Sequence, residues 1–258
     1  MTPKYPWVSK LTLDDKIERA RDLTDKILDH SQLLLRIHYS NYQLIYSDLT
    51  SKQVRRSYGA HTFNLLQATQ YRFEIIRLCA LWDNPSEHRE SIPTLLMFLN
   101  DSVKDELQRQ YAKQWERTSI FSASSDQDFS EEESQSIRDF IMESEIQFGL
   151  AEAQKSRRKL ELAIKAAKAL LKSKKLSALR DFRDTRLAHN LISSASTISA
   201  HDRAKYGDER YVLERTLQIV SCLNLGIRGS SFDWGRSKKL AERYAGAFWG
   251  GVSINVIE

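Results

Sequence analysis

Glycine and proline are scarce in this sequence, which has 9 glycines and 4 prolines among 258 residues. At average usage of roughly 7% and 5%, a chain of this length would hold about twice as many glycines and three times as many prolines. Both residues punctuate turns and break helices, whereas Leu, Ala, Lys, Glu, Arg and Gln, which are abundant here, favour helix. The composition therefore predicts an all-α fold, which we expect to be a bundle of five or six helices.

Cysteine is also scarce, since Cys79 and Cys222 are the only two. Neither has a nearby partner, which argues against a zinc knuckle or a redox pair, and two buried thiols are typical of a reducing compartment. Residues 1–6 carry no apolar signal core, and no window approaches the ~18 apolar residues that span a bilayer. We therefore expect a cytoplasmic protein without a membrane segment.

Several cofactor signatures are missing as well. The sequence contains no glycine-rich phosphate loop, no HExxH pair and no paired cysteine cluster. These are the short motifs through which nucleotide cofactors and catalytic zinc are most readily recognised. We expect neither a metal nor a cofactor.

Positive charge is concentrated in one part of the chain. The net charge is only +5, but residues 155–186 hold twelve Lys or Arg against three acids, a balance of +9 that leaves −4 for the remainder. Residues 124–145 hold eight acids against one arginine. A basic stripe attracts polyanions without specifying their sequence, although a solvated helix face is the alternative explanation.

Hydrophobic spacing divides one expected domain, residues 1–258, into helical segments. We expect helices over 12–50 and 60–83, a motif-bearing region over 130–228, and a short helix with a tail over 229–258. The first segment is one long helix or a pair broken near residues 29–31. His38 and Asn41 lie on its apolar stripe, where burial without hydrogen bonds would cost about 1–3 kcal/mol. They are either satisfied buried polar groups, a polar dimer seam, or part of the lining of a site.

The stretch 179–190, LRDFRDTRLAHN, is the strongest candidate for function. It places three arginines and one histidine at the end of the basic segment. On an ideal α-helix, Arg183 and His189 are rotated by about 120° and would not face one point. Either the helix unwinds before His189, as the helix-stopping Asn190 suggests, or two copies of the chain complete the site together.

This Arg…His spacing, with Asp184 directly after the arginine, resembles the Arg-x(4 to 6)-His signature of the HEPN superfamily, and RDTRLAHN is most similar to its AbiU2-type branch. A second segment, LCALWDNPSEHRESIPTLLMFL, resembles the Leu-rich helix, Asp-x-Pro-like stop and Leu-rich helix that precede the motif in that branch. The resemblance implies an HEPN-like helical bundle with an N-terminal helical extension. It also implies a prokaryotic phage-defence protein of the abortive-infection or toxin–antitoxin type.

The family resemblance further implies a metal-independent endoribonuclease whose two motifs meet at a homodimer interface. Catalysis would rest on His189 as general acid or base, on Arg183 as the phosphate ligand and on Asp184 as the residue that orients them. The expected RNA-binding residues are Arg180, Arg186, Lys172, Lys174 and Lys175. Supporting roles around the site are expected for His38, Asn41 and Asn190.

The sequence leaves other roles open. A non-catalytic helical protein could use the same fold for interaction or for sensing nucleic acid, and a cognate antitoxin or defence-system partner could act with the chain. Some HEPN toxins carry a tyrosine two residues after the histidine that a partner antitoxin nucleotidylates. Leu191 stands at that position, so we do not expect this mode of neutralisation.

Overall fold

Two long helices, α2 and α7, organise the computed structural model, which describes residues 5–47, 52–54, 58–116, 130–188 and 204–254. The elements are α1 (Pro6–Ser9), α2 (Leu13–Tyr46), α4 (Tyr58–Ala80), α5 (Ile92–Phe98), α6 (Asp101–Glu116), α7 (Glu131–Leu171), α8 (Lys174–Phe182), the π-helical turn η1 (Arg183–Ala188), α9 (Asp208–Arg228) and α10 (Trp234–Gly251). The described residues contain no strand, so the all-α expectation is confirmed. They contain nine α-helices, more than the five or six expected.

Helix α2 is continuous, and the expected alternative of a break near residues 29–31 is wrong. The Thr12 hydroxyl accepts from the backbone N–H of Asp15, whose carboxylate accepts from the Thr12 N–H, so both bonds of a capping box are present. Ser31, inside the proposed break, donates its hydroxyl to the carbonyl of Ile27 at 2.7 Å. Its polar group is thus satisfied within the helix, and the helical path continues.

The Leu-rich segment after residue 90 forms two helices where its spacing predicted one. The Ser91 hydroxyl caps α5 by accepting from the N–H of Thr94, and proline lies in the first turn. The helix ends at Phe98, because the Asn100 side chain accepts from the N–H of Val103 and opens the new helix α6. The short-range cap therefore outweighs the continuous apolar pattern.

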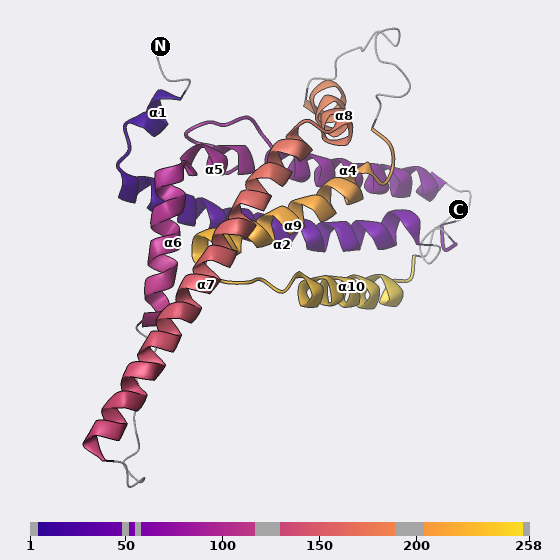
Figure 1. The fold of residues 1–258 in the computed structure, drawn as a ribbon. Coiled ribbons are helices and arrows are strands. Elements are labelled where there is room, and N and C mark those ends of the chain that lie inside the picture. Colours follow the sequence, from indigo (N-terminus) through magenta and orange to yellow (C-terminus); the bar gives the residue numbers. More distant parts are fainter. Residues whose placement is uncertain (1–4, 48–51, 55–57, 117–129, 189–203, 255–258) are drawn as a thin grey trace.

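The later part of α7 lies between α6 and α9, while α10 lies along α2 (Figure 1). The α7–α9 approach is close at Gly226, where an added Cβ would be 2.6 Å from the Cβ of Leu160. Gly149 likewise faces α6, because a Cβ added there would lie 2.8 Å from the Cβ of Trp115, so this glycine allows close packing of α7 on α6. The first turns of α7 extend past the end of α6 (Figure 1).

Helix α10 continues to Gly251 and so takes up most of the segment 229–258 that was expected to hold a short helix and a tail. Within the described ranges, no helix combines the length and the apolar character that a membrane span requires.

Candidate functional site

The motif segment begins in α8 and continues into the wider turn η1. The Ser173 hydroxyl accepts from the N–H of Leu176 and starts α8, and the fully buried Leu176 and Leu179 fix its inner face. From Arg183 onward the backbone is π-helical, with hydrogen bonds between residues five apart, a form common at functional sites. The backbone thus leaves α-helical geometry before His189, so the 120° offset of an ideal α-helix does not apply to this segment. His189 and Asn190 lie outside the described residues.

Arg183 is held by two carboxylates. Its Nε donates to Oδ1 of Asp184 at 2.7 Å, and its Nη1 donates to Oδ1 of Asp83 at 2.7 Å. Only 19% of the Arg183 side chain is exposed, compared with 56% for Asp184. A guanidinium has five N–H donors, and these two bonds use two of them. Among the residues that the structure describes, the other three donors, including both on Nη2, have no hydrogen-bond partner.

The electrostatic surroundings keep Arg183 charged. Partial burial acts to lower its pKa, but the hydrogen bonds to Asp184 and Asp83 outweigh burial and raise the pKa above its ordinary value. Burial lowers the pKa of the neighbouring Arg180, whose buried Nη2 has no hydrogen-bond partner among the described residues. The positive charges of the two arginines thus balance the negative charges of Asp83 and Asp184. Arg180 therefore offsets carboxylate charge that would otherwise repel an anion.

Cys79 lies close to this cluster, and burial raises the pKa of its thiol to about 12. A thiol with so high a pKa is neutral at physiological pH and a poor nucleophile. Cys79 therefore contributes to packing and not to chemistry.

Asp83 is the site residue that sequence reasoning missed. It follows Trp82, which is fully buried and donates its indole N–H to the Thr216 hydroxyl at 2.9 Å. Its own carbonyl accepts from the Ser91 hydroxyl at 3.0 Å. These contacts fix the backbone where α4 ends and direct the carboxylate toward Arg183. The available signal was the Asp-x-Pro-like stop, which had been interpreted only as a helix end.

The structure separates the five expected RNA-binding residues into different environments. Lys172 and Lys174 are exposed. Lys175 pairs with Asp208 at 3.0 Å and lies 4.5 Å above the ring of Tyr211, so its charge is already engaged. Arg180 is partly buried beside Arg183, and the side chain of Arg186 is outside the described set.

One of three comparisons with known proteins identifies a family for this chain. The AbiU2 family model, HEPN_AbiU2, matches residues 17–248. The chain belongs to this family. No curated protein and no solved structure gave a match. The matched region includes every described residue of the Arg183 cluster: Asp83 just after α4, Arg180 in α8, and Arg183 and Asp184 in η1.

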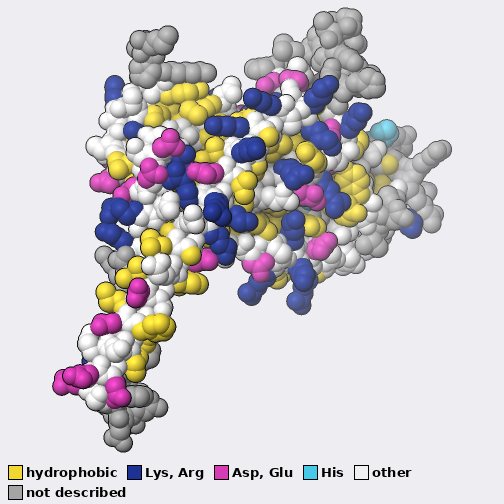
Figure 2. Space-filling view, viewed as in Figure 1, with side chains coloured by type: hydrophobic (Ala, Val, Ile, Leu, Met, Phe, Trp, Pro, Cys, Tyr) yellow, Lys and Arg dark blue, Asp and Glu magenta, His cyan; other side chains and the backbone are white. Residues whose placement is uncertain are grey.

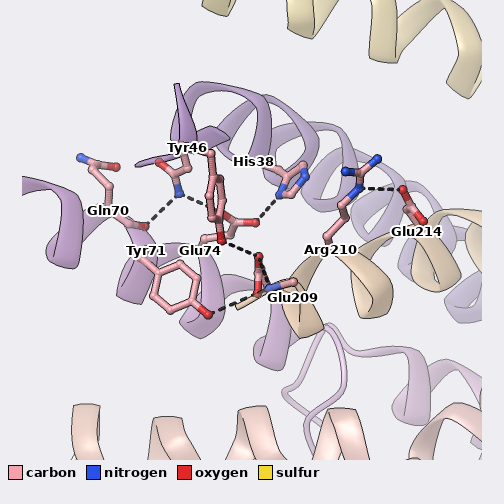
Figure 3. Close-up of polar contacts among 10 residues, drawn as sticks. His38, Tyr46, Gln70, Tyr71, Glu74, Glu209, Arg210 and Glu214 are labelled. Atoms are coloured by element: carbon pink, nitrogen blue, oxygen red, sulfur yellow. Dashed lines mark hydrogen bonds and ion pairs between the residues drawn. The ribbon is translucent and has the colours of Figure 1, made fainter. Parts of the chain in front are cut away.

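In this AbiU2-type HEPN chain, His38 and Asn41 belong to a buried network between α2 and α4 (Figure 3). Nδ1 of His38 lies 2.7 Å from Oε1 of Glu74, and Nδ2 of Asn41 donates to Oε2 of the same carboxylate at 2.8 Å. Asn41 also donates to the carbonyl of Gln70. Both residues have the hydrogen bonds that burial demands, and these bonds lead to Glu74 instead of to Arg183 or Asp184.

A second buried carboxylate, Glu209, anchors the start of α9 (Figure 3). It accepts from the hydroxyls of Tyr46 and Tyr71 at 3.3 and 3.2 Å and from the N–H of Gly207. Burial, followed by the charge of Glu209, raises the pKa of both tyrosines. Glu209 therefore fixes the point at which the chain returns from the motif segment to the bundle.

A cavity of about 210 Å³ opens beside the motif segment of the AbiU2-type chain. It is lined by Ala68, Tyr71, Arg72, Ile75, Phe182, Ala204 and Tyr206. The rings of Tyr71 and Tyr206 lie 5.0 Å apart, and 73% of Tyr206 is exposed. Phe182, which lines the cavity, directly precedes Arg183 in the chain. In the described ranges no group of three or more His, Cys, Asp or Glu is placed to hold a metal ion.

Proposed function

We propose that this AbiU2-type HEPN protein is a metal-independent endoribonuclease. The observation that carries the proposal is the setting of Arg183, which lies at the start of a π-helical turn and is held by two carboxylates. Within the described part of the chain, three of its N–H donors have no partner. The aspartates hold the guanidinium in one orientation without occupying Nη2. A rigid, permanently charged fork of this kind matches the oxygens of a phosphodiester.

In the proposed reaction, a ribose 2′-oxygen attacks the adjacent phosphorus. The O2′–P bond forms as the P–O5′ bond breaks, which gives a 2′,3′-cyclic phosphate and a free 5′-hydroxyl. The imidazole of His189 in one copy of the chain takes the proton from the 2′-hydroxyl. Another group, or the His189 imidazole of a second copy, gives a proton to the 5′-oxygen. Arg183 stabilises the charge that develops on the non-bridging oxygens, and Asp184 and Asp83 position it.

A homodimer would supply the second imidazole. Two copies of the motif that converge at a subunit interface form a composite cleft, as the family resemblance implies. We expect such an interface to bury more than ~1,200 Å² in total, the lower bound for specific association. The proposed setting is phage defence by abortive infection, with a cognate antitoxin or another defence-system protein as partner and the cytoplasm as location.

The aromatic cavity supports an RNA substrate. Sequence-tolerant binding of single strands combines basic side chains with rings on which unpaired bases stack. Tyr206 and Phe182 supply rings at the cavity, and Arg72 supplies a cation. A base next to the scissile phosphate could enter this cavity while Arg183 holds the phosphate.

Replacing Tyr206 by alanine tests this placement. We expect the affinity for a short single-stranded RNA to fall about tenfold, because base stacking on an aromatic ring contributes ~1–3 kcal/mol. Tyr206→Phe keeps the ring and should bind as the wild type does, in fluorescence anisotropy titrations. Equal affinities for all three proteins would remove the cavity from the binding surface.

The exposed lysines give a second expected result. Changing Lys172 and Lys174 to glutamate should weaken RNA binding and flatten its salt dependence, since each phosphate contact in a single strand contributes about 0.7 to the slope of log K against log salt. Arg236 and Lys239, exposed on α10, form the matched control pair. If both pairs lowered the slope equally, binding would depend on overall charge and not on the stripe.

The direct test is incubation of the purified chain with RNA in EDTA. Cleavage that leaves 2′,3′-cyclic phosphate ends supports the proposal. Binding without cleavage would favour the alternative of a non-catalytic, nucleic-acid-sensing protein.

A further inference from the structure

The first half of α7, residues 131–148, forms an arm that exposes large apolar side chains. The exposed fractions are 42% for Ile137, 72% for Phe140 and 51% for Phe148. Figure 2 shows hydrophobic and acidic side chains together along this arm, where it extends from the body of the molecule. Contiguous apolar surface of this kind in a soluble protein marks an interaction site.

The body of the protein gives the arm little support. The ring of Phe148 meets the ring of Trp115 at 4.8 Å, and Trp115 is next to the last residue of α6. Beyond that contact, every residue from 135 to 140 is exposed. An isolated helix of about this length is only marginally stable in water, and Ser, Phe, Ile and Asp in the arm are weak helix formers. A packing partner would cover the exposed side chains of the arm and would also stabilise it as a helix.

The second half of α7 offers a matching surface on the same side of the helix. Leu162 follows Phe140 by 22 residues, which is about six turns, so both lie on one face. Leu162 is 58% exposed and borders a groove of about 370 Å³ between α7 and α9. Ala166 and Ala169 continue its floor, and Tyr211 and Ile219 form the opposite wall.

The charges of the two halves are complementary. Residues 131–145 contain six acids and one arginine, a balance of −5, whereas residues 152–171 contain six Lys or Arg and two glutamates, a balance of +4. A parallel pair of α7 helices would place like charges opposite each other. An antiparallel pair places each acidic arm beside a basic half and also aligns the helix dipoles favourably.

We propose that α7 pairs with α7 of a second copy of this chain in antiparallel orientation, each arm lying in the α7–α9 groove of its partner. A two-fold interface uses the same self-complementary surface on both subunits, and α7 has such a surface. With the axis at the small, exposed Ala151, Phe140 lies opposite Leu162 and Glu143 lies opposite Lys159. In this register Phe140 and Leu162 form an apolar pair at each end, while Ile137 lies beside Lys165 of the partner subunit, within its basic half.

This interface differs from the motif-to-motif interface proposed above and does not depend on RNA cleavage. Because the two α7 helices run in opposite directions, the segments that carry Arg183 are placed at opposite ends of the pair. Copies that use both interfaces assemble beyond a dimer. Loss of the arm interface should therefore lower the particle mass in either case, to that of a monomer where this interface acts alone and to that of the motif-to-motif dimer where both act.

Light scattering on the full chain tests the pairing. We expect Ile137→Gln combined with Phe140→Gln to lower the particle mass at ~10 µM, while Met142→Gln leaves it unchanged. Met142 is as exposed as the others, but it is rotated by about 200° from Phe140 and faces away from the stripe. A monomeric wild type, or an unchanged mass for the double variant, would overturn the proposal even if the chain cleaves RNA.

A cysteine introduced at Ala151 tests the register. On the two-fold axis it meets its own copy, so Ala151→Cys should form a disulfide-linked dimer under mild oxidation in a Cys222→Ser background; Cys79 is buried. Leu150→Cys, exposed but off the stripe, is the matched control. Equal cross-linking at the two positions, or none at Ala151, would rule out the antiparallel pair with this axis.

Discussion

Replacing His189 by alanine is expected to slow RNA cleavage by about 10²- to 10⁴-fold, the usual contribution of one general acid or base. RNA binding should persist, because the basic stripe and the aromatic cavity are unchanged. The measurement is single-turnover cleavage of a labelled RNA in EDTA, with the cyclic phosphate end identified in the product. Expression of the wild type, but not of the variant, should slow bacterial growth.

Arg183 should behave differently from His189, because it also supports the fold. Alanine at this position removes two charge-assisted hydrogen bonds and leaves Asp83 and Asp184 without their partner. We expect a loss of about 1–3 kcal/mol in the free energy of unfolding. Arg183→Lys keeps the charge but cannot make parallel bonds to a phosphate and a carboxylate. Lysine should therefore retain most of the stability while cleavage falls by about 10²- to 10³-fold.

Arg243, an exposed arginine on α10, provides the control for a general loss of positive charge. Its replacement by alanine should leave both cleavage and stability unchanged. If His189→Ala cut RNA as fast as the wild type, the endoribonuclease proposal would fail, and the interaction-protein alternative would remain. A normal cleavage rate for Arg183→Lys would show that charge alone is sufficient and that the geometry of the guanidinium is not used.

Features with short-range sequence signals were predictable. The capping box at Ser130 and Glu133 marks the start of α7, because both partners of its hydrogen bonds lie within three positions of each other. Ser91 marks α5 for the same reason. The apolar stripe of α2 predicted its buried face, including the two polar residues that needed partners, although it could not identify Glu74 as that partner.

Features that depend on distant residues were not predictable. Arg183 and Asp83 are 100 positions apart, and a single sequence contains no signal that pairs them. Lys175 appeared free in the basic stripe, yet Asp208, 33 positions later, engages it. The π-helical turn at Arg183 also escaped, because an inserted residue in a helix leaves the local apolar spacing almost unchanged. The sequence therefore identifies candidate residues more readily than it predicts the contacts and backbone geometry that position them.

Replacing Trp82 by alanine is expected to give the largest loss of stability, about 3–5 kcal/mol in the free energy of unfolding. The indole is fully buried at the end of α4 and joins this helix to α9 through Thr216. Alanine would remove most of the buried side-chain volume and also the N–H donor. Thermal melting followed by circular dichroism, together with urea titration, measures the loss.

Trp82→Phe separates packing from hydrogen bonding. Phenylalanine keeps much of the ring but leaves the Thr216 oxygen without the indole donor, while Thr216 still donates to the carbonyl of Val212. We expect a cost of about 1–3 kcal/mol, smaller than that of alanine. A relaxed backbone at Trp82 would also move Asp83, so Trp82→Phe should lower the cleavage rate more than the RNA affinity. A variant that loses stability but cleaves at the wild-type rate would show that Asp83 holds its position without the Trp82 anchor.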